Sequence, residues 1–166
     1  MTIEPRPKLL TSEMAMSAAR RIARRLAESR LIAEEDADGC AADIAECARR
    51  DMDGYEIARD LEGTCDWNCT LQIAEELDRF SDEARREIKG AEKEWAERNG
   101  PTPPFSIGTR VRFAPDKTGM ITGIDEYGVA RFLVAVDGEA DTPTGKSRRI
   151  VNFEDAHAIE GEASNG

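Results

Sequence analysis

The sequence predicts an α+β fold in which a helical bundle of four to five helices precedes a small antiparallel β-barrel. Three observations lead to this prediction. Apolar residues recur every three to four positions over residues 11–99, as on the buried face of a helix. Three prolines then occur within residues 101–104. Beyond them the apolar period falls to two, which is typical of half-buried strands.

The first predicted helices follow a disordered lead over residues 1–10. Thr11 or Ser12 can cap the first of them, because a hydroxyl oxygen accepts a hydrogen bond from a free N–H of the first turn. That helix has a length of about twenty residues by its apolar spacing. A second predicted helix covers residues 38–50.

The later helices are shorter or interrupted. A third begins near Tyr55 and is expected to stop at Gly63, since glycine commonly ends helices. Asp66 or Asn68 is expected to cap a fourth. Ser81 either kinks that helix or starts a fifth. Residues 11–99 are thus predicted to form one acidic helical domain.

The prolines make residues 100–105 a stiff linker, because proline cannot continue a helix and restricts the chain. The barrel is predicted over residues 106–160, and residues 161–166 form a tail. The expected strands are 109–114, 119–125, 130–137, 148–153 and a short one at 158–159. Alternation directs Phe132 and Ile150 inward.

Two runs in the second part carry a family resemblance. Residues 107–113 read IGTRVRF and residues 118–124 read TGMITGI. They resemble the first two strands of SH3-like small barrels of the KOW or Tudor kind, in which a Gly-x-x-Val strand leads to a Thr-Gly-x-Ile strand. The resemblance covers residues 105–160, about a third of the chain, and implies that fold but no particular function. In residues 55–80 and 95–105 the helical part resembles small accessory proteins of prophages and mobile elements.

Charge is unevenly distributed along the chain. The net charge is −11 overall, +4 over residues 1–33, −12 over residues 34–100 and −3 over the remainder. A chain this acidic is a poor ligand for bare nucleic acid, whose phosphates require clustered lysine and arginine. It is compatible with a basic partner or simply with high solubility.

The acidic middle suggests a specific mechanism. Rows of carboxylates on a helix can imitate the phosphates of a duplex and occupy a nucleic-acid-binding groove. The candidate row is Glu75, Glu76, Asp78, Asp82, Glu83 and Glu87. The sequence therefore predicts a non-enzymatic protein-binding protein. It is expected to be an acidic accessory or inhibitor protein of the phage-encoded, anti-CRISPR-like kind, which blocks a basic, nucleic-acid-binding host protein by charge mimicry. The alternative for the row is a solvated helix face with pairs such as Asp82–Arg86.

Basic clusters support competing interpretations. Arg20, Arg21, Arg24 and Arg25 share the polar face of the first helix. They can contact nucleic acid or an anionic membrane surface. They can also pack against the acidic middle of the same chain or of a second copy, the latter giving a homodimer through this helix. In the barrel, a basic face of Arg110, Arg112, Arg131, Lys146, Arg148 and Arg149 would serve a nucleic-acid-associated regulator that contacts RNA or DNA.

The four cysteines have no strong metal signature. Cys40, Cys47, Cys65 and Cys69 have the spacing C-x6-C, then 17 residues, then C-x3-C. Paired C-x2-C knuckles would have indicated zinc. Reduced cysteines buried in the core are the favoured interpretation, with zinc binding and disulfides as alternatives.

No enzyme motif is present. The chain has no G-x-S-x-G, G-x-G-x-x-G, P-loop or H-E-x-x-H sequence. Its one histidine, His157, is expected on the surface near the end of the barrel. We therefore expect no catalytic residues and no cofactor. A membrane span and a secretory signal are also absent from the pattern, so the expected location is the cytoplasm.

Overall fold

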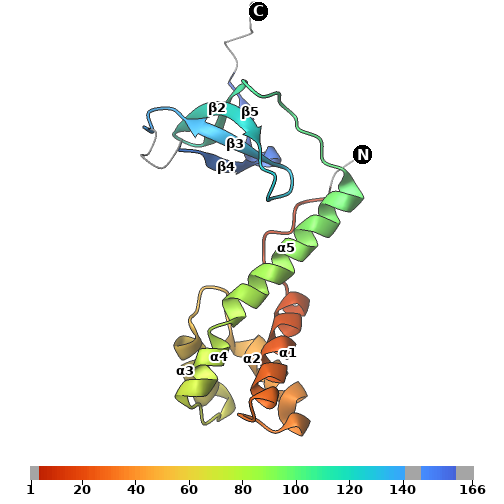
Figure 1. The fold of residues 1–166 in the computed structure, drawn as a ribbon, viewed down its shortest axis with the longest axis vertical. Coiled ribbons are helices and arrows are strands. Elements are labelled where there is room, and N and C mark those ends of the chain that lie inside the picture. The colour runs from red at the N-terminus through yellow and green to blue at the C-terminus, as the bar shows by residue number, and fades with distance from the viewer. Residues whose placement is uncertain (1–3, 141–146, 160–166) are drawn as a thin grey trace, which may run out of the picture. The chain divides into compact units, whose positions relative to one another are not determined.

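The computed structural model describes residues 4–140 and 147–159 (Figure 1). Helices come first and an antiparallel sheet follows, so the predicted α+β arrangement is confirmed. The chain divides into two compact units, Met1–Trp95 and Ala96–Gly166. We call them the helical unit and the sheet unit. The division falls within the last helix, ahead of the linker predicted at residues 100–105, and the predicted tail at 161–166 lies outside the described residues.

The first two helices begin as their sequences suggest. Helix α1 is Ser12–Glu28, and the Thr11 side chain caps it by accepting a hydrogen bond from the backbone N–H of Met14 at 3.2 Å. A 3₁₀ turn at Glu34–Asp36 leads into helix α2, Ala37–Cys47.

The ends of the next helices differ from those predicted. Helix α3, Gly54–Cys65, runs through Gly63 and ends where Asp66 adopts a left-handed conformation. Helix α4, Leu71–Leu77, is capped by Thr70 and not by Asp66 or Asn68. A threonine directly before the first apolar residue can bond the N–H of Ile73 at 3.3 Å, whereas the two earlier residues lie too far from that turn.

The break between the last helices precedes the predicted position. Helix α5 is Phe80–Asn99, so Ser81 lies within it. The amphipathic faces of α1 to α4 and the start of α5 enclose one core. Its fully buried large side chains are Ile22, Leu26, Ile44, Ile57, Leu61, Leu77 and Phe80.

Residues 4–10 belong to the helical unit rather than forming a disordered lead. Arg6 is buried, and its guanidinium lies 5.1 Å from the centre of the Trp95 ring. The Trp95 indole N–H donates to the carbonyl of Glu4 at 2.7 Å. The two prolines that led to the prediction of a disordered lead only argue against a helix, and here a cation–π contact and an indole hydrogen bond attach these residues to Trp95.

The sheet unit is a curled, five-stranded antiparallel sheet (Figure 1). Its strands are β1 Arg110–Ala114, β2 Lys117–Ile124, β3 Arg131–Val136, β4 Arg149–Asn152 and β5 His157–Ala158. Their order is β4-β3-β2-β1-β5, so β4 and β5 form the two edges of the described sheet. A 3₁₀ turn at Phe153–Asp155 connects those edge strands.

The core of the sheet unit confirms Phe132 as an inward residue but reverses β4. Phe132 is fully buried and pairs with Val151, which is also buried. Ile150 was predicted inward, but it is 58% exposed. Successive residues of a strand point to opposite faces, so placing Val151 and Phe153 in the core necessarily turns Ile150 outward.

Candidate functional site

The predicted acidic row on α4 and α5 is largely committed to ion pairs within the chain. Glu83 is buried, with a side chain only 8% exposed, and it accepts a hydrogen bond from Arg21 Nε at 2.6 Å. Glu87 accepts from the same guanidinium at 2.5 Å. Glu76 pairs with Arg25 at 3.2 Å. Three of the six predicted partner-binding carboxylates therefore already have arginine partners on α1.

The network around Arg21 is dense enough to shift its titration. Partial burial acts to lower the pKa of Arg21, but hydrogen bonds and charge from Glu87 and Glu83 outweigh it and raise the pKa above its ordinary value. Ser17 extends the network, because its hydroxyl donates to Glu87 at 3.1 Å and accepts from Arg21. Arg86 adds a second cation to Glu83 at 3.0 Å. Packing against the acidic middle of the same chain was one of the interpretations that the sequence left open for these arginines, and it is confirmed for Arg21 and Arg25.

The other three carboxylates of the row have different surroundings. Asp78 accepts a hydrogen bond from the backbone N–H of Gly54 at 3.0 Å and thereby joins the end of α4 to the start of α3. The side chain of Asp82 is 80% exposed and pairs with Arg85. Glu75 is exposed. The row is also divided by the break between α4 and α5, so it does not form a continuous line of available charge.

The remaining arginines of the first helix face outward. Arg20 and Arg24 are exposed and have no ion-pair partner among the described residues. They line a shallow hollow together with the acidic residues Glu28, Glu34 and Asp38. Positive and negative groups thus both line this hollow.

The basic residues of the sheet unit are also partly neutralised. Arg110 pairs with Asp137, and Arg149 pairs with Glu139 at 3.1 Å. The Arg149 bond, followed by that from Ser147, lowers the pKa of Glu139 below its ordinary value. Arg148 is half-buried. Lys146, the other predicted contact beside it, lies outside the described residues.

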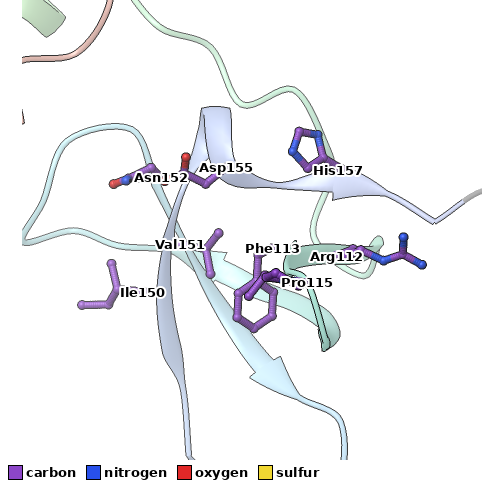
Figure 2. A pocket seen from close by; sticks show the side chains of 9 residues that line it. Arg112, Phe113, Pro115, Ile150, Val151, Asn152, Asp155 and His157 are labelled. Atoms are coloured by element: carbon purple, nitrogen blue, oxygen red, sulfur yellow. Dashed lines mark hydrogen bonds between the residues drawn. The ribbon is translucent and has the colours of Figure 1, made fainter.

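A groove of about 450 Å³ opens in the sheet unit between strands that are not neighbours in the sheet. Figure 2 shows its lining, which β1 and β4 supply from two sides and Asp155 and His157 complete. Because β2 and β3 lie between β1 and β4 in the strand order, the curl of the sheet is what brings their residues to one groove. The full lining is Arg112, Phe113, Ala114, Pro115, Ile150, Val151, Asn152, Asp155 and His157.

The groove combines an apolar floor with a polar rim. Phe113 and Pro115 lie near its centre in Figure 2. Ile150 adds an exposed branched side chain from β4. On the rim, the amide of Asn152 donates to the carboxylate of Asp155 at 2.7 Å, and His157 is exposed. The predicted surface position of His157 is confirmed.

The edge of β4 adjoins this groove. Its ladder with β3 pairs Val151 with Phe132, and the N–H of Phe153 donates to the carbonyl of Ala130. Hydrogen-bonded and non-bonded pairs alternate along an antiparallel ladder. Phe153 and Ala130 form a bonded pair, so Val151 and Phe132 form the next bonded pair, and Ile150 and Leu133 form a non-bonded pair. The backbone groups of Ile150 therefore point to the open side of β4.

Sequence reasoning did not find this groove. The sequence did contain a clue to the outward position of Ile150. Within residues 149–153, Val151 and Phe153 provide two bulky apolar side chains on one face of the strand, and Ile150 provides only one on the other face. Choosing the heavier face as the core would have placed Ile150 outside. The contribution of Phe113 and Pro115 depends on the curl of the sheet and has no local signal.

The cysteines lie in the helical unit. Cys47 and Cys65 end helices α2 and α3, and their sulfur atoms are 3.8 Å apart. Cys40 and Cys69 are half-buried, and each packs against the same core. Within residues 4–140 and 147–159, no group of three or more histidine, cysteine or acidic side chains is arranged to hold a metal ion.

Comparison with known proteins gives no relative from which a role could be transferred. No protein family, no curated protein and no solved structure matches the chain significantly. Among the helices that the structure describes, none combines the length and apolar character needed to cross a membrane.

Proposed function

We propose that this chain is a non-enzymatic protein-binding protein that receives an extended segment of its partner in the groove of the sheet unit. The observation that carries the proposal is the composition of the groove. It sets the apolar groups of Phe113, Pro115 and Ile150 beside an open strand edge and a polar rim. Such a surface suits an extended peptide whose backbone can pair with the strand edge and whose apolar side chain can be buried in the groove.

The physical basis is strand addition. An extended peptide can join a sheet edge through backbone hydrogen bonds, while pockets for alternate side chains provide specificity. The backbone of Ile150 faces that edge, and its side chain, 58% exposed, would be covered by the peptide. Burial of apolar area contributes roughly 25 cal/mol per Å², so one covered isoleucine adds a useful share of the binding energy.

We further propose that the sheet unit is an SH3-like barrel, as its sequence resemblance implies. Two features support this assignment. Strands β1 to β4 form a consecutive meander, and β5 returns to pair with β1. The 3₁₀ turn at Phe153–Asp155 makes that return. The fold by itself indicates no particular ligand.

The surfaces proposed from charge alone receive less support. A basic partner that used Glu76, Glu83 and Glu87 would have to displace arginines already bound to them. A nucleic acid that used Arg110 and Arg149 would compete with Asp137 and Glu139. The groove requires no such exchange.

The proposal is tested by selecting peptides from a random library on the intact chain. Peptides that bind the groove should lose at least about tenfold in affinity on Ile150→Asp, because a carboxylate would then occupy the apolar contact. The matched control is Ile107→Asp, since Ile107 is 65% exposed in the same unit but does not line the groove. Affinities are measured by calorimetry.

Backbone amide shifts in NMR spectra locate the bound peptide. We expect shifts at Phe113, Ile150 and His157. If the selected peptides bind equally to Ile150→Asp and Ile107→Asp, or shift only amides of the helical unit, the groove is not the binding surface. Selection of basic peptides whose binding depends on Glu75 and Asp82 would instead support charge mimicry by the acidic residues.

A further inference from the structure

Two cysteines far apart in sequence meet where helices α2 and α3 end. Cys47 is the last residue of α2 and Cys65 the last of α3, and 3.8 Å separates their sulfur atoms. A disulfide has a sulfur–sulfur bond of about 2.05 Å. The two sulfur atoms would therefore have to move less than about 2 Å to bond, which side-chain rotation and a small helix adjustment can supply.

The two thiols differ in access. Cys47 is 6% exposed, whereas Cys65 is only partly buried. Partial burial, together with the nearby thiol of Cys47 and the carboxylates of Asp43 and Glu46, raises the pKa of Cys65 to about 11. Most of this thiol is consequently protonated at neutral pH, which is unlike the activated thiolate of a catalytic cysteine.

The surrounding chain holds the pair in place. Trp67 follows Cys65 by two residues, and its indole N–H donates to Asp43 of α2 at 2.8 Å. Its backbone N–H donates to the carbonyl of Leu61 in α3 at 3.3 Å. Trp67 thus connects the end of α3 to α2. It lies two residues from Cys65, and its partner Asp43 lies four residues from Cys47.

We propose that Cys47 and Cys65 form a reversible intramolecular disulfide that fastens the end of α2 to the end of α3. The other two cysteines, Cys40 and Cys69, take no part in it. This inference does not depend on the function proposed for the sheet unit.

The oxidant is a low-molecular-weight disulfide such as oxidised glutathione. The more accessible Cys65 loses its proton, and its thiolate attacks one glutathione sulfur, which forms a mixed disulfide and releases one glutathione thiolate. The Cys47 thiolate then attacks the Cys65 sulfur and releases the second glutathione. Two protein thiols are oxidised, one small disulfide is reduced to two thiols, and the two protons lost by the protein pass to the departing glutathione thiolates.

The experiment treats the full chain with oxidised glutathione at pH 8.5, blocks the remaining thiols and digests the protein before each aspartate. This cleavage separates all four cysteines, on peptides 38–42, 43–50, 60–65 and 66–77. We expect a linked product of peptides 43–50 and 60–65. Because the fold holds the two thiols together, it should form at an oxidant concentration at least about tenfold lower in the folded chain than in guanidinium.

Matched variants separate this pair from the other thiols. Cys40→Ser with Cys69→Ser should retain the linked product, whereas Cys47→Ala and Cys65→Ala should each lose it. The oxidised double variant should also melt at a higher temperature than its reduced form, since a cross-link restricts the unfolded chain. Three outcomes would refute the proposal. They are glutathione adducts with no protein disulfide, disulfides that involve Cys40 or Cys69, and disulfide formation at the same oxidant concentration in guanidinium as in the folded chain.

Discussion

At the scale of single residues, Glu83 shows how strongly context changes the value of a charge. It lies in the first turn of α5 beside Asp82, and both carboxylates favour the positive end of the helix. Their surroundings differ greatly, because the side chain of Glu83 is 8% exposed between Arg21 and Arg86 and that of Asp82 is 80% exposed. The same residue class is structural at one position and solvated at the next.

We predict that Glu83→Gln lowers the free energy of unfolding by about 2 kcal/mol, because it leaves a partly buried guanidinium with a weaker partner. Asp82→Asn, the matched control, should change it by less than about 0.5 kcal/mol, since exposed pairs contribute little. Urea unfolding measures both variants. Equal effects would mean that the burial of Glu83 does not determine its contribution.

Glu139 gives the sheet unit a pH dependence. Its pKa is lowered from 4.5, mainly by the hydrogen bond from Arg149 and then by that from Ser147. Above pH 4.5 the carboxylate is charged in both states and the folded state gains these bonds. As the pH falls below 4.5 the unfolded chain takes up the proton first, so the gain decreases and is lost once the folded group is protonated.

We therefore expect wild-type sheet stability to fall more steeply below pH 4.5 than that of Glu139→Gln. Methyl NMR signals of the sheet core during urea titrations at several pH values follow this difference. A direct NMR titration that placed the pKa of Glu139 at or above 4.5 would contradict the explanation.

The positions of single residues could be predicted from the sequence where one local interaction determines them. The cap of the first helix could be narrowed to Thr11 or Ser12 because a capping bond lies within one turn, and Thr11 makes it. Ile150 could not be placed, because its orientation depends on which face of β4 meets Phe132 in the folded sheet. Arg6 was assigned to a disordered lead because its contact is with Trp95, far along the chain.

At the scale of elements, the junction of α3 with α4 depends on the absence of a side chain. A Cβ added at Gly54 would lie 2.0 Å from the carbonyl oxygen of Ala74 and 2.4 Å from the N–H nitrogen of Asp78. Gly63, in the same helix, has nothing within 4 Å of that position. One glycine permits close packing, and the other only weakens the helix.

We predict opposite outcomes for the two alanine variants. Gly54→Ala should destabilise the helical unit by about 3 kcal/mol, because backbone atoms on both sides must move apart. Gly63→Ala should stabilise it by about 0.5–1 kcal/mol through higher helix propensity. Thermal unfolding followed by circular dichroism provides the comparison, and a destabilised Gly63→Ala would show that α3 does not tolerate alanine at that position.

Helix positions were predictable, but helix ends were less so. The apolar spacing identified α1 to α5 because each buries one face. The expected stop at Gly63 was wrong because glycine ends a helix only where a left-handed turn is needed, and that turn is supplied by Asp66 with φ of 55°.

At the scale of the whole molecule, the two tryptophans report on only one unit. Trp67 and Trp95 both belong to Met1–Trp95. In the sheet unit, a Cβ at Gly119 would lie 2.3 Å from the carbonyl oxygen of Ala135 on the neighbouring strand. Gly119→Ala should therefore weaken the sheet without touching the helical core.

We expect Gly119→Ala to lower sheet stability by about 2–3 kcal/mol, as measured by methyl NMR signals of Ile121 and Val134 in urea. The midpoint of tryptophan fluorescence should stay within about 0.3 kcal/mol of the wild type, because we expect each compact unit to unfold by itself and independent sites do not couple. A fluorescence midpoint that moved together with the methyl signals would show that the two units unfold as one.

The order of helices before a sheet follows from the amino-acid sequence alone, because the change of apolar period from 3.6 to 2 beyond residues 101–104 is a local property of the chain. The number of charges that the chain carries follows from it as well. Which charges pair with one another depends on the folded chain. Arg21 and Glu83 are 62 residues apart and meet because the fold brings their side chains, from α1 and from the start of α5, within hydrogen-bond distance. The groove of the sheet unit arises in the same way, because β1 and β4 come together only when the sheet curls.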